Sequence, residues 1–207
     1  MSTVTQDGKV CHDARVDENV PDLGRTNGDV YVATFDVLTF DTVTSTQDVA
    51  RAAVHAHLIG AAMPEGIKAL TGDTVIRAAE QQSGRGRRAR DWRSARGGSY
   101  QTLLFAPPLA KKPALSVWLA IGIARAIHEA GVHITIKWPN DLYVDGQKVA
   151  GLLAEWCQGW LLVGVGVNVT NPVPDGAARL ALPLEHVHTR VLAGACAGVR
   201  DWQDSAA

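Results

Sequence analysis

The chain has 207 residues, of which 46% are hydrophobic and 20% charged, and its formal net charge is -1. This is the composition of an ordinary soluble domain with enough apolar residues for a sizeable core, and one main domain is expected. The near-neutral balance argues against a general nucleic-acid coat, in which Lys and Arg would spread over a whole face.

The cysteines and the N-terminal segment exclude further classes. Cys11, Cys157 and Cys196 are odd in number and widely spaced, without a C-x-x-C pair, so neither a disulfide framework nor a zinc site is indicated. Residues 1–34 contain no apolar run of the kind that a secretory leader needs, and the richest apolar stretch, 115–127, is interrupted by an arginine. We therefore predict a cytoplasmic protein without a membrane segment.

The periodicity divides the chain into three parts. Residues 1–34 are predicted to be a polar, mobile extension, residues 35–186 the main folded domain, and residues 187–207 a short tail without a β-rich module. Ser45 to Asp48 resembles the capped start of a helix that runs to about Leu58. The other expected elements are strands over 35–40, 74–80, 100–106, 134–138, 142–144, 148–156 and 160–169, a helix over 113–131, and at most one or two short helices after 180.

Two dipeptides connect the later strands, Asp145-Gly146 and Gln158-Gly159, and both are suited to tight hairpin turns. The element order therefore predicts an α+β fold with a mixed, largely antiparallel sheet backed by helices.

Residues 84–96 place six arginines in thirteen positions. Neighbouring guanidinium groups repel one another by about 0.5 to 1 kcal/mol per pair, so the loop is expected to rest open and to close on an anion. A solvated basic loop, or a site for RNA or a membrane surface, remains an alternative. The spacing of Gly84, Gly86 and Ala89 also fits a dinucleotide fingerprint, but arginines follow where that motif requires an apolar helix.

A second polar segment, Lys-Trp-Pro-Asn-Asp-Leu at 137–142, predicts a turn that presents Asn140 and Asp141 at a strand end. Lys148 begins the next strand, where alternation gives it the apolar same-face neighbours Ala150 and Leu152, so its ammonium needs water or an anion. Gly151 would allow a close approach of ligand or backbone. An ordinary turn and a snorkelling lysine are the competing interpretations.

Together, four motifs resemble the catalytic domain of biotin protein ligases. They are Ser45-Thr46-Gln47, the Gln-Gln-Ser-Gly-Arg-Gly-Arg-Arg run at 81–88, the 137–142 segment through Lys148 and Gly151, and Gly164-x-Gly166-x-Asn168. The resemblance covers about residues 35–170. It implies the class II synthetase-like fold of biotin and lipoate ligases, and a biotin--[biotin carboxyl-carrier protein] ligase that forms biotinyl-5′-AMP from biotin and ATP and passes biotin to a carrier lysine.

The resemblance also implies a role for each matching residue. Lys148, Arg87 and Asp141 would be catalytic, with Asp141 helping to hold Mg²⁺. The residues implied for biotin are Ser45, Thr46, Gln47, Gln82, Arg85, Gly86, Arg87, Arg88, Lys148 and Gly151. Those implied for ATP and the adenylate are Arg87, Arg88, Trp92, Asn140, Asp141, Lys148 and Asn168.

The implied partner is the biotin carboxyl carrier domain of a carboxylase. Neither DNA nor a membrane is predicted as a partner, because 34 polar residues cannot hold the family's helix-turn-helix, and a homodimer is left open. Ala89 replaces a glycine of the family loop, and a positive φ there would cost about 1 kcal/mol. A biotin- or anion-binding remnant without ligation and a lipoate or octanoate ligase-type enzyme are the alternative functions.

Overall fold

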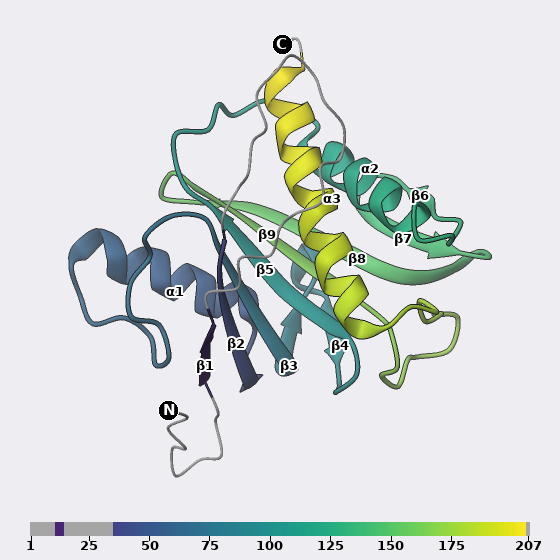
Figure 1. Ribbon diagram of the computed structural model, residues 1–207, viewed down its shortest axis with the longest axis horizontal. Coiled ribbons are helices and arrows are strands. Elements are labelled where there is room, and N and C mark those ends of the chain that lie inside the picture. Colours follow the sequence, from purple (N-terminus) through teal and green to yellow (C-terminus); the bar gives the residue numbers. More distant parts are fainter. Residues whose placement is uncertain (1–10, 15–34, 206–207) are drawn as a thin grey trace.

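The structure is a computed structural model that describes residues 11–14 and 35–205, arranged around one nine-stranded sheet (Figure 1). The strand order is β1-β2-β3-β5-β9-β8-β7-β6, and β4 pairs with β3 off this path. Only β2 and β3 are parallel among the paired strands described, which confirms the predicted mixed, largely antiparallel sheet. The strands are β1 Cys11–Ala14, β2 Asp36–Val43, β3 Thr74–Arg85, β4 Asp91–Ser94, β5 Ser99–Phe105, β6 Thr135–Lys137, β7 Asp141–Val144, β8 Gln147–Cys157 and β9 Trp160–Val167.

Strand β2 is followed by helix α1, Thr46–Ile59. The Ser45 hydroxyl caps this helix by accepting a hydrogen bond from Gln47 N, and Gly60 ends it in the left-handed region at φ 64°. The predicted capped helix start is therefore confirmed. Within the predicted extension, residues 11–14 form β1, and the rest of that extension lies outside the described residues.

The far half of the sheet is a meander whose turns follow the predicted dipeptides. Asp145 and Gly146, which join β7 to β8, have φ values of 48° and 73°, and Gln158 and Gly159, which join β8 to β9, have 48° and 93°. Two consecutive positive φ values suit the right-handed twist of paired strands, so both hairpin predictions are confirmed.

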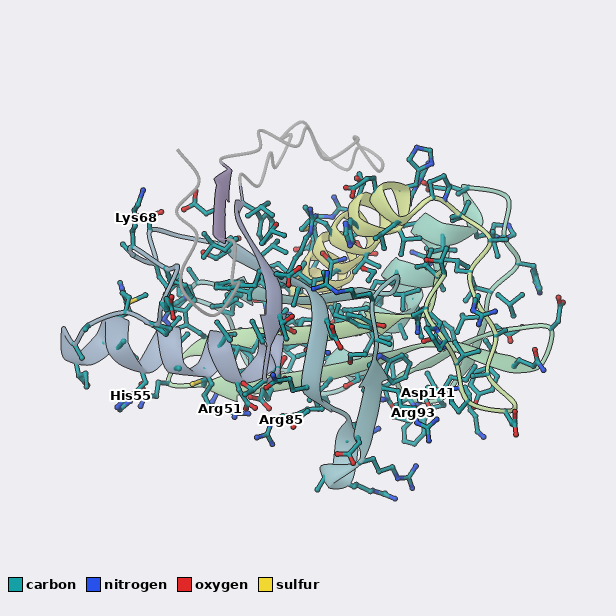
Figure 2. All side chains as sticks on the ribbon, turned by 90° about the horizontal axis from the view of Figure 1, so that it is seen from below. Arg51, His55, Lys68, Arg85, Arg93 and Asp141 are labelled. Carbon is teal, nitrogen blue, oxygen red and sulfur yellow. The ribbon has the colours of Figure 1, made fainter. Side chains whose placement is uncertain are left out.

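Two apolar layers lie on opposite faces of the sheet (Figures 1 and 2). Helices α2, Leu115–His128, and α3, Leu184–Asp204, cover one face, where Leu119, Ile123 and Trp202 are fully buried. Helix α1 covers part of the other face with a smaller core. No helix of residues 11–14 and 35–205 covers the remainder of that face, where the candidate site lies.

The C-terminal prediction was wrong in one respect. In place of one or two short helices, residues 184–204 form a single helix, so the predicted domain boundary at 186 falls inside an element. Helix α3 crosses α2 so closely that a Cβ added to Gly122 would lie 2.1 Å from the carbonyl oxygen of Gly194. These glycines are thus contact points between the two helix backbones, where a side chain would not fit. Within residues 11–14 and 35–205, every helix is too short or too polar to cross a bilayer.

Candidate functional site

The arginine-rich segment is a β-hairpin and not an irregular loop between strands. Strand β3 continues to Arg85, a 3-10 turn η1 spans Arg87–Ala89, and β4 returns along β3. A Cβ added to Gly84 would lie 2.4 Å from Trp92 O, so this position requires glycine for close strand approach. The hairpin projects from the sheet on the side of α1 (Figure 2).

A pocket of about 470 Å³ lies beneath this hairpin, between the start of α1, the 137–141 turn and strands β8 and β9. Its size is typical of small-molecule sites. The structure brings most of the predicted residues to it, from four separate segments of the chain. The predicted residues that line it are Ser45, Thr46, Gln47, Arg85, Gly86, Arg87, Arg88, Trp92, Asn140, Asp141, Lys148 and Gly151.

One end of the pocket is a buried polar network at the start of α1. Gln81 Oε1 accepts hydrogen bonds from Thr46 N (2.8 Å) and Thr46 Oγ1 (3.1 Å), and Gln81 Nε2 donates to Ser94 Oγ at 2.7 Å. Thr102 Oγ1, from β5, lies 2.9 Å from Thr46 Oγ1 and 3.1 Å from Gln47 Oε1. These groups fix one another, so a ligand meets a preorganised set of donors and acceptors.

Gln81 therefore takes the place that the sequence analysis gave to Gln82. The Gln82 side chain is exposed and does not line the pocket. Successive side chains of a strand point to opposite faces, so only one of two adjacent glutamines can enter the site. The sequence contained both, and nothing in it distinguished them.

Lys148 lies in the pocket because of a β-bulge. The pairing of β7 with β8 shifts by one residue between Leu142 and Tyr143, and Val149 and Ala150 are both fully buried. The expected same-face arrangement of Lys148 with Ala150 was wrong, since the bulge turns the lysine away from the apolar core. Its Nζ lies 2.9 Å from Asp141 Oδ1 and 5.3 Å from the centroid of the Trp92 ring.

Two glycines of β9 form the floor. Trp160 and Leu162 precede these glycines on the same face of β9, and their side chains belong to the smaller core beneath α1. A Cβ on Gly164 would lie 2.6 Å from Gln47 Oε1, and one on Gly166 would lie 2.4 Å from Trp92 Nε1. The absence of side chains at these two positions opens the space that the pocket occupies.

Two buried side-chain nitrogens make no hydrogen bond within the described part of the chain. They are Gln47 Nε2 and Trp92 Nε1, and both residues line the pocket. An unpartnered buried N–H costs about 1 to 3 kcal/mol, and native proteins rarely leave one without a reason. A ligand with acceptors at these two places would remove that cost.

Arginines surround the mouth of the pocket. Arg87 Nη1 donates to Asn140 Oδ1 at 2.9 Å, and Asn140 Nδ2 donates in turn to Leu152 O. Arg88 and Arg90 also line the mouth, and neither forms an ion pair with any described residue. The hairpin thus supplies several guanidinium groups to one entrance, which favours an anionic ligand.

Asn168 is the second predicted residue outside the pocket. Its Nδ2 donates to Ala178 O at 3.2 Å, and its Oδ1 accepts from Asn171 Nδ2 at 3.2 Å. The amide therefore fastens the loop after β9, which explains its burial without a ligand. Asp141 is held by Lys148, and the described residues contain no group of three or more His, Cys, Asp or Glu side chains that could hold a metal.

Fold and site together define a class: a mixed-sheet protein whose pocket has a buried polar end and a cationic mouth, under an arginine-rich hairpin. The chain belongs to the Biotin/lipoate A/B protein ligase family, whose sequence profile matches residues 64–170. The resemblance drawn from the four motifs is confirmed at this level.

Curated relatives and solved structures agree with this assignment. The Bifunctional ligase/repressor BirA of Bacillus subtilis is 36% identical over 123 residues, which are 54% of this chain and 38% of that protein. The Biotin--[acetyl-CoA-carboxylase] ligase of Paracoccus denitrificans is 35% identical over 122 residues, 53% of this chain and 49% of that protein. The chain thus matches less than half of the length of either relative. The biotin protein ligase from Aquifex aeolicus in complex with biotin and ATP has a TM-score of 0.66 at 26% identity, covering 82% of this chain and 72% of that one.

Proposed function

We propose that this protein is an ATP-dependent biotin ligase that forms biotinyl-5′-AMP and transfers biotin to a lysine of a carboxylase carrier domain. The observation that carries the proposal is the polarity of one pocket. A buried network of amides and hydroxyls lies at its closed end, and cationic side chains lie at its mouth. This order matches an acid with a polar ring at one end and a carboxylate at the other.

The closed end favours biotin over the apolar-tailed acids used elsewhere in the family. Gln47 is 3% exposed, and its unpaired Nε2 favours a strong acceptor, which a ureido carbonyl offers and an aliphatic tail does not. Exchange of Gln47 for the similarly sized methionine removes this donor. We expect Gln47→Met to lose about tenfold in biotin affinity and to improve relative binding of octanoate or lipoate.

The open end supports adenylation. The carboxylate of biotin must approach the α-phosphate of ATP against mutual repulsion, and fixed cations offset that repulsion. Lys148 would stand at this meeting point, and its contacts with Asp141 and with Trp92 of the hairpin support that role. ATP would arrive as its magnesium complex, and a contact of that metal with Asp141 remains a prediction, because it would have to compete with the Lys148 ammonium.

The hairpin would retain the reactive anhydride. Arg87 joins the hairpin to Asn140 on the opposite side of the mouth, which limits access of water and of unintended amines. The predicted absence of DNA binding, the cytoplasmic location and a homodimer all remain predictions.

Adenylate formation tests the proposal. With biotin and MgATP, mass spectrometry should detect biotinyl-5′-AMP for the wild type, and Lys148→Ala should abolish it. Lys111→Ala is the matched control, because Lys111 contacts Trp156 on the α3 side of the sheet, outside the pocket. Arg87→Gly should still form adenylate but release it, which would label bystander lysines. Biotin binding without any adenylate in the wild type would favour a binding remnant, and a preference for lipoate would favour the lipoate-type enzyme.

A further inference from the structure

Asp48, in the first turn of α1, connects the hairpin to the body of the protein. Its Oδ2 accepts a hydrogen bond from Arg85 Nε at 2.8 Å, and its Oδ1 accepts one from Arg51 Nη1 at 2.8 Å. Arg51 Nη2 in turn donates to Glu155 Oε1 of β8 at 2.6 Å. Four alternating charges therefore link β8, α1 and the hairpin, and Figure 2 shows Arg51 and Arg85 close together beside α1.

The geometry of the Arg85 contact leaves part of its guanidinium free. Asp48 engages the Nε–H, and no hydrogen bond among the described residues uses the two terminal amino groups of Arg85. An arginine held through Nε still offers its planar pair of terminal donors, which match a carboxylate. Arg85 is one of the residues that line the pocket, and its side chain is 52% exposed, so the two terminal amino groups remain accessible to a ligand.

The neighbours of Asp48 also reduce the repulsion that its negative charge would exert on an anionic ligand at the pocket mouth. Asp48 is partly buried, with its side chain 25% exposed, and it lies in the first turn of a helix, where a negative charge is favoured. Arg51 neutralises it from the side opposite to Arg85. The carboxylate can thus orient Arg85 without cancelling the positive charge of the whole mouth.

We propose that Asp48 is a positioning residue, which holds the Arg85 guanidinium at the pocket mouth and presents its terminal amino groups to the carboxylate of the acid substrate. The substrate part of this inference rests on the proposed function, whereas the attachment of the hairpin to α1 through Asp48 does not. Asp48 itself touches no reacting atom.

The experiment compares Asp48→Ala and Asp48→Asn with a matched control. Asp41→Ala is that control, because Asp41 forms an equivalent ion pair with Arg96 near the base of the hairpin and does not line the pocket. The dissociation constant for biotin is measured by calorimetry. Amide hydrogen exchange of residues 84–94 is measured without ligand.

Asp48→Ala should weaken biotin binding about tenfold and speed exchange in the hairpin. Asp48→Asn keeps an acceptor for the Arg85 Nε–H and should stay within about threefold of wild type, and Asp41→Ala should change neither quantity. In an Arg85→Gln background, Asp48→Ala should cause no further loss of affinity, a result that a general loss of stability would not give.

Unchanged or tighter binding by Asp48→Ala, or an equal loss in the Arg85→Gln background, would overturn the positioning role. If the wild type binds no biotin, the proposed function fails, and the exchange data still decide the attachment. Equal exchange of the hairpin in wild type and Asp48→Ala would then overturn it.

Discussion

The replacement of Ala89 by glycine should hold the hairpin closed more firmly. Ala89 has a φ of 55° and follows Arg88 at 57°, so two consecutive side chains occupy the left-handed region. This conformation costs a residue with a Cβ about 1 to 2 kcal/mol, whereas glycine adopts it freely. Glycine also gains about 0.4 to 1 kcal/mol of chain freedom when the hairpin opens. The net gain for closure is therefore about 0.5 to 1 kcal/mol, a factor of about 2 to 5 in the closed population.

The residence time of the acyl-adenylate measures this effect. Ala89→Gly should release preformed biotinyl-5′-AMP about 2 to 5 times more slowly than wild type. Ala114→Gly is the matched control, because Ala114 has a similar φ of 62° but lies at the start of α2, outside the pocket. It should raise the free energy of unfolding and leave the release rate unchanged. Faster release by Ala89→Gly, or equal slowing by both variants, would refute the reasoning.

Two further glycine substitutions test the floor and the helix crossing, with Gly72→Ala as a control because no atom lies within 4 Å of its added Cβ. Gly166→Ala would place a methyl group 2.4 Å from Trp92 Nε1, so it should displace that ring and shorten the residence time of the adenylate about tenfold. An unchanged residence time would argue against the packing of Trp92 on the pocket floor. Gly122→Ala would place its Cβ 2.1 Å from Gly194 O and should lower the free energy of unfolding by about 1 to 3 kcal/mol, measured by denaturant titration. A stability equal to that of Gly72→Ala would show that α2 and α3 can separate without cost.

Local chemistry made much of the fold predictable. The Ser45 cap and the two turn dipeptides depend only on neighbouring residues, and each appears where the sequence indicated it. The length of α3, for which only one or two short helices were expected, was not predictable for the opposite reason. Its glycines at 194 and 198 are unfavourable for an isolated helix and become acceptable only against α2, a contact between segments far apart in the chain.

In the candidate site, too, the features set by neighbouring residues were predictable, and those set by contacts between distant segments were not. Residue types and their order were sufficient to place twelve predicted residues around one pocket, because each motif comes at a strand or helix end. The side that each residue faces was not predictable at three positions. A β-bulge changes the side to which Lys148 points, and strand alternation decides which of Gln81 and Gln82 faces the pocket. Asn168 instead forms a hydrogen bond with the loop after β9, whose path the sequence did not indicate.

Transfer of labelled biotin to a purified carboxylase carrier domain tests the central claim most directly. The 207-residue chain with MgATP should label one carrier lysine, the Lys148→Ala variant should label none, and lipoate in excess should not compete. Absence of label on the carrier from the wild-type chain, under conditions where biotin is bound, would contradict the assignment of this protein as a biotin ligase.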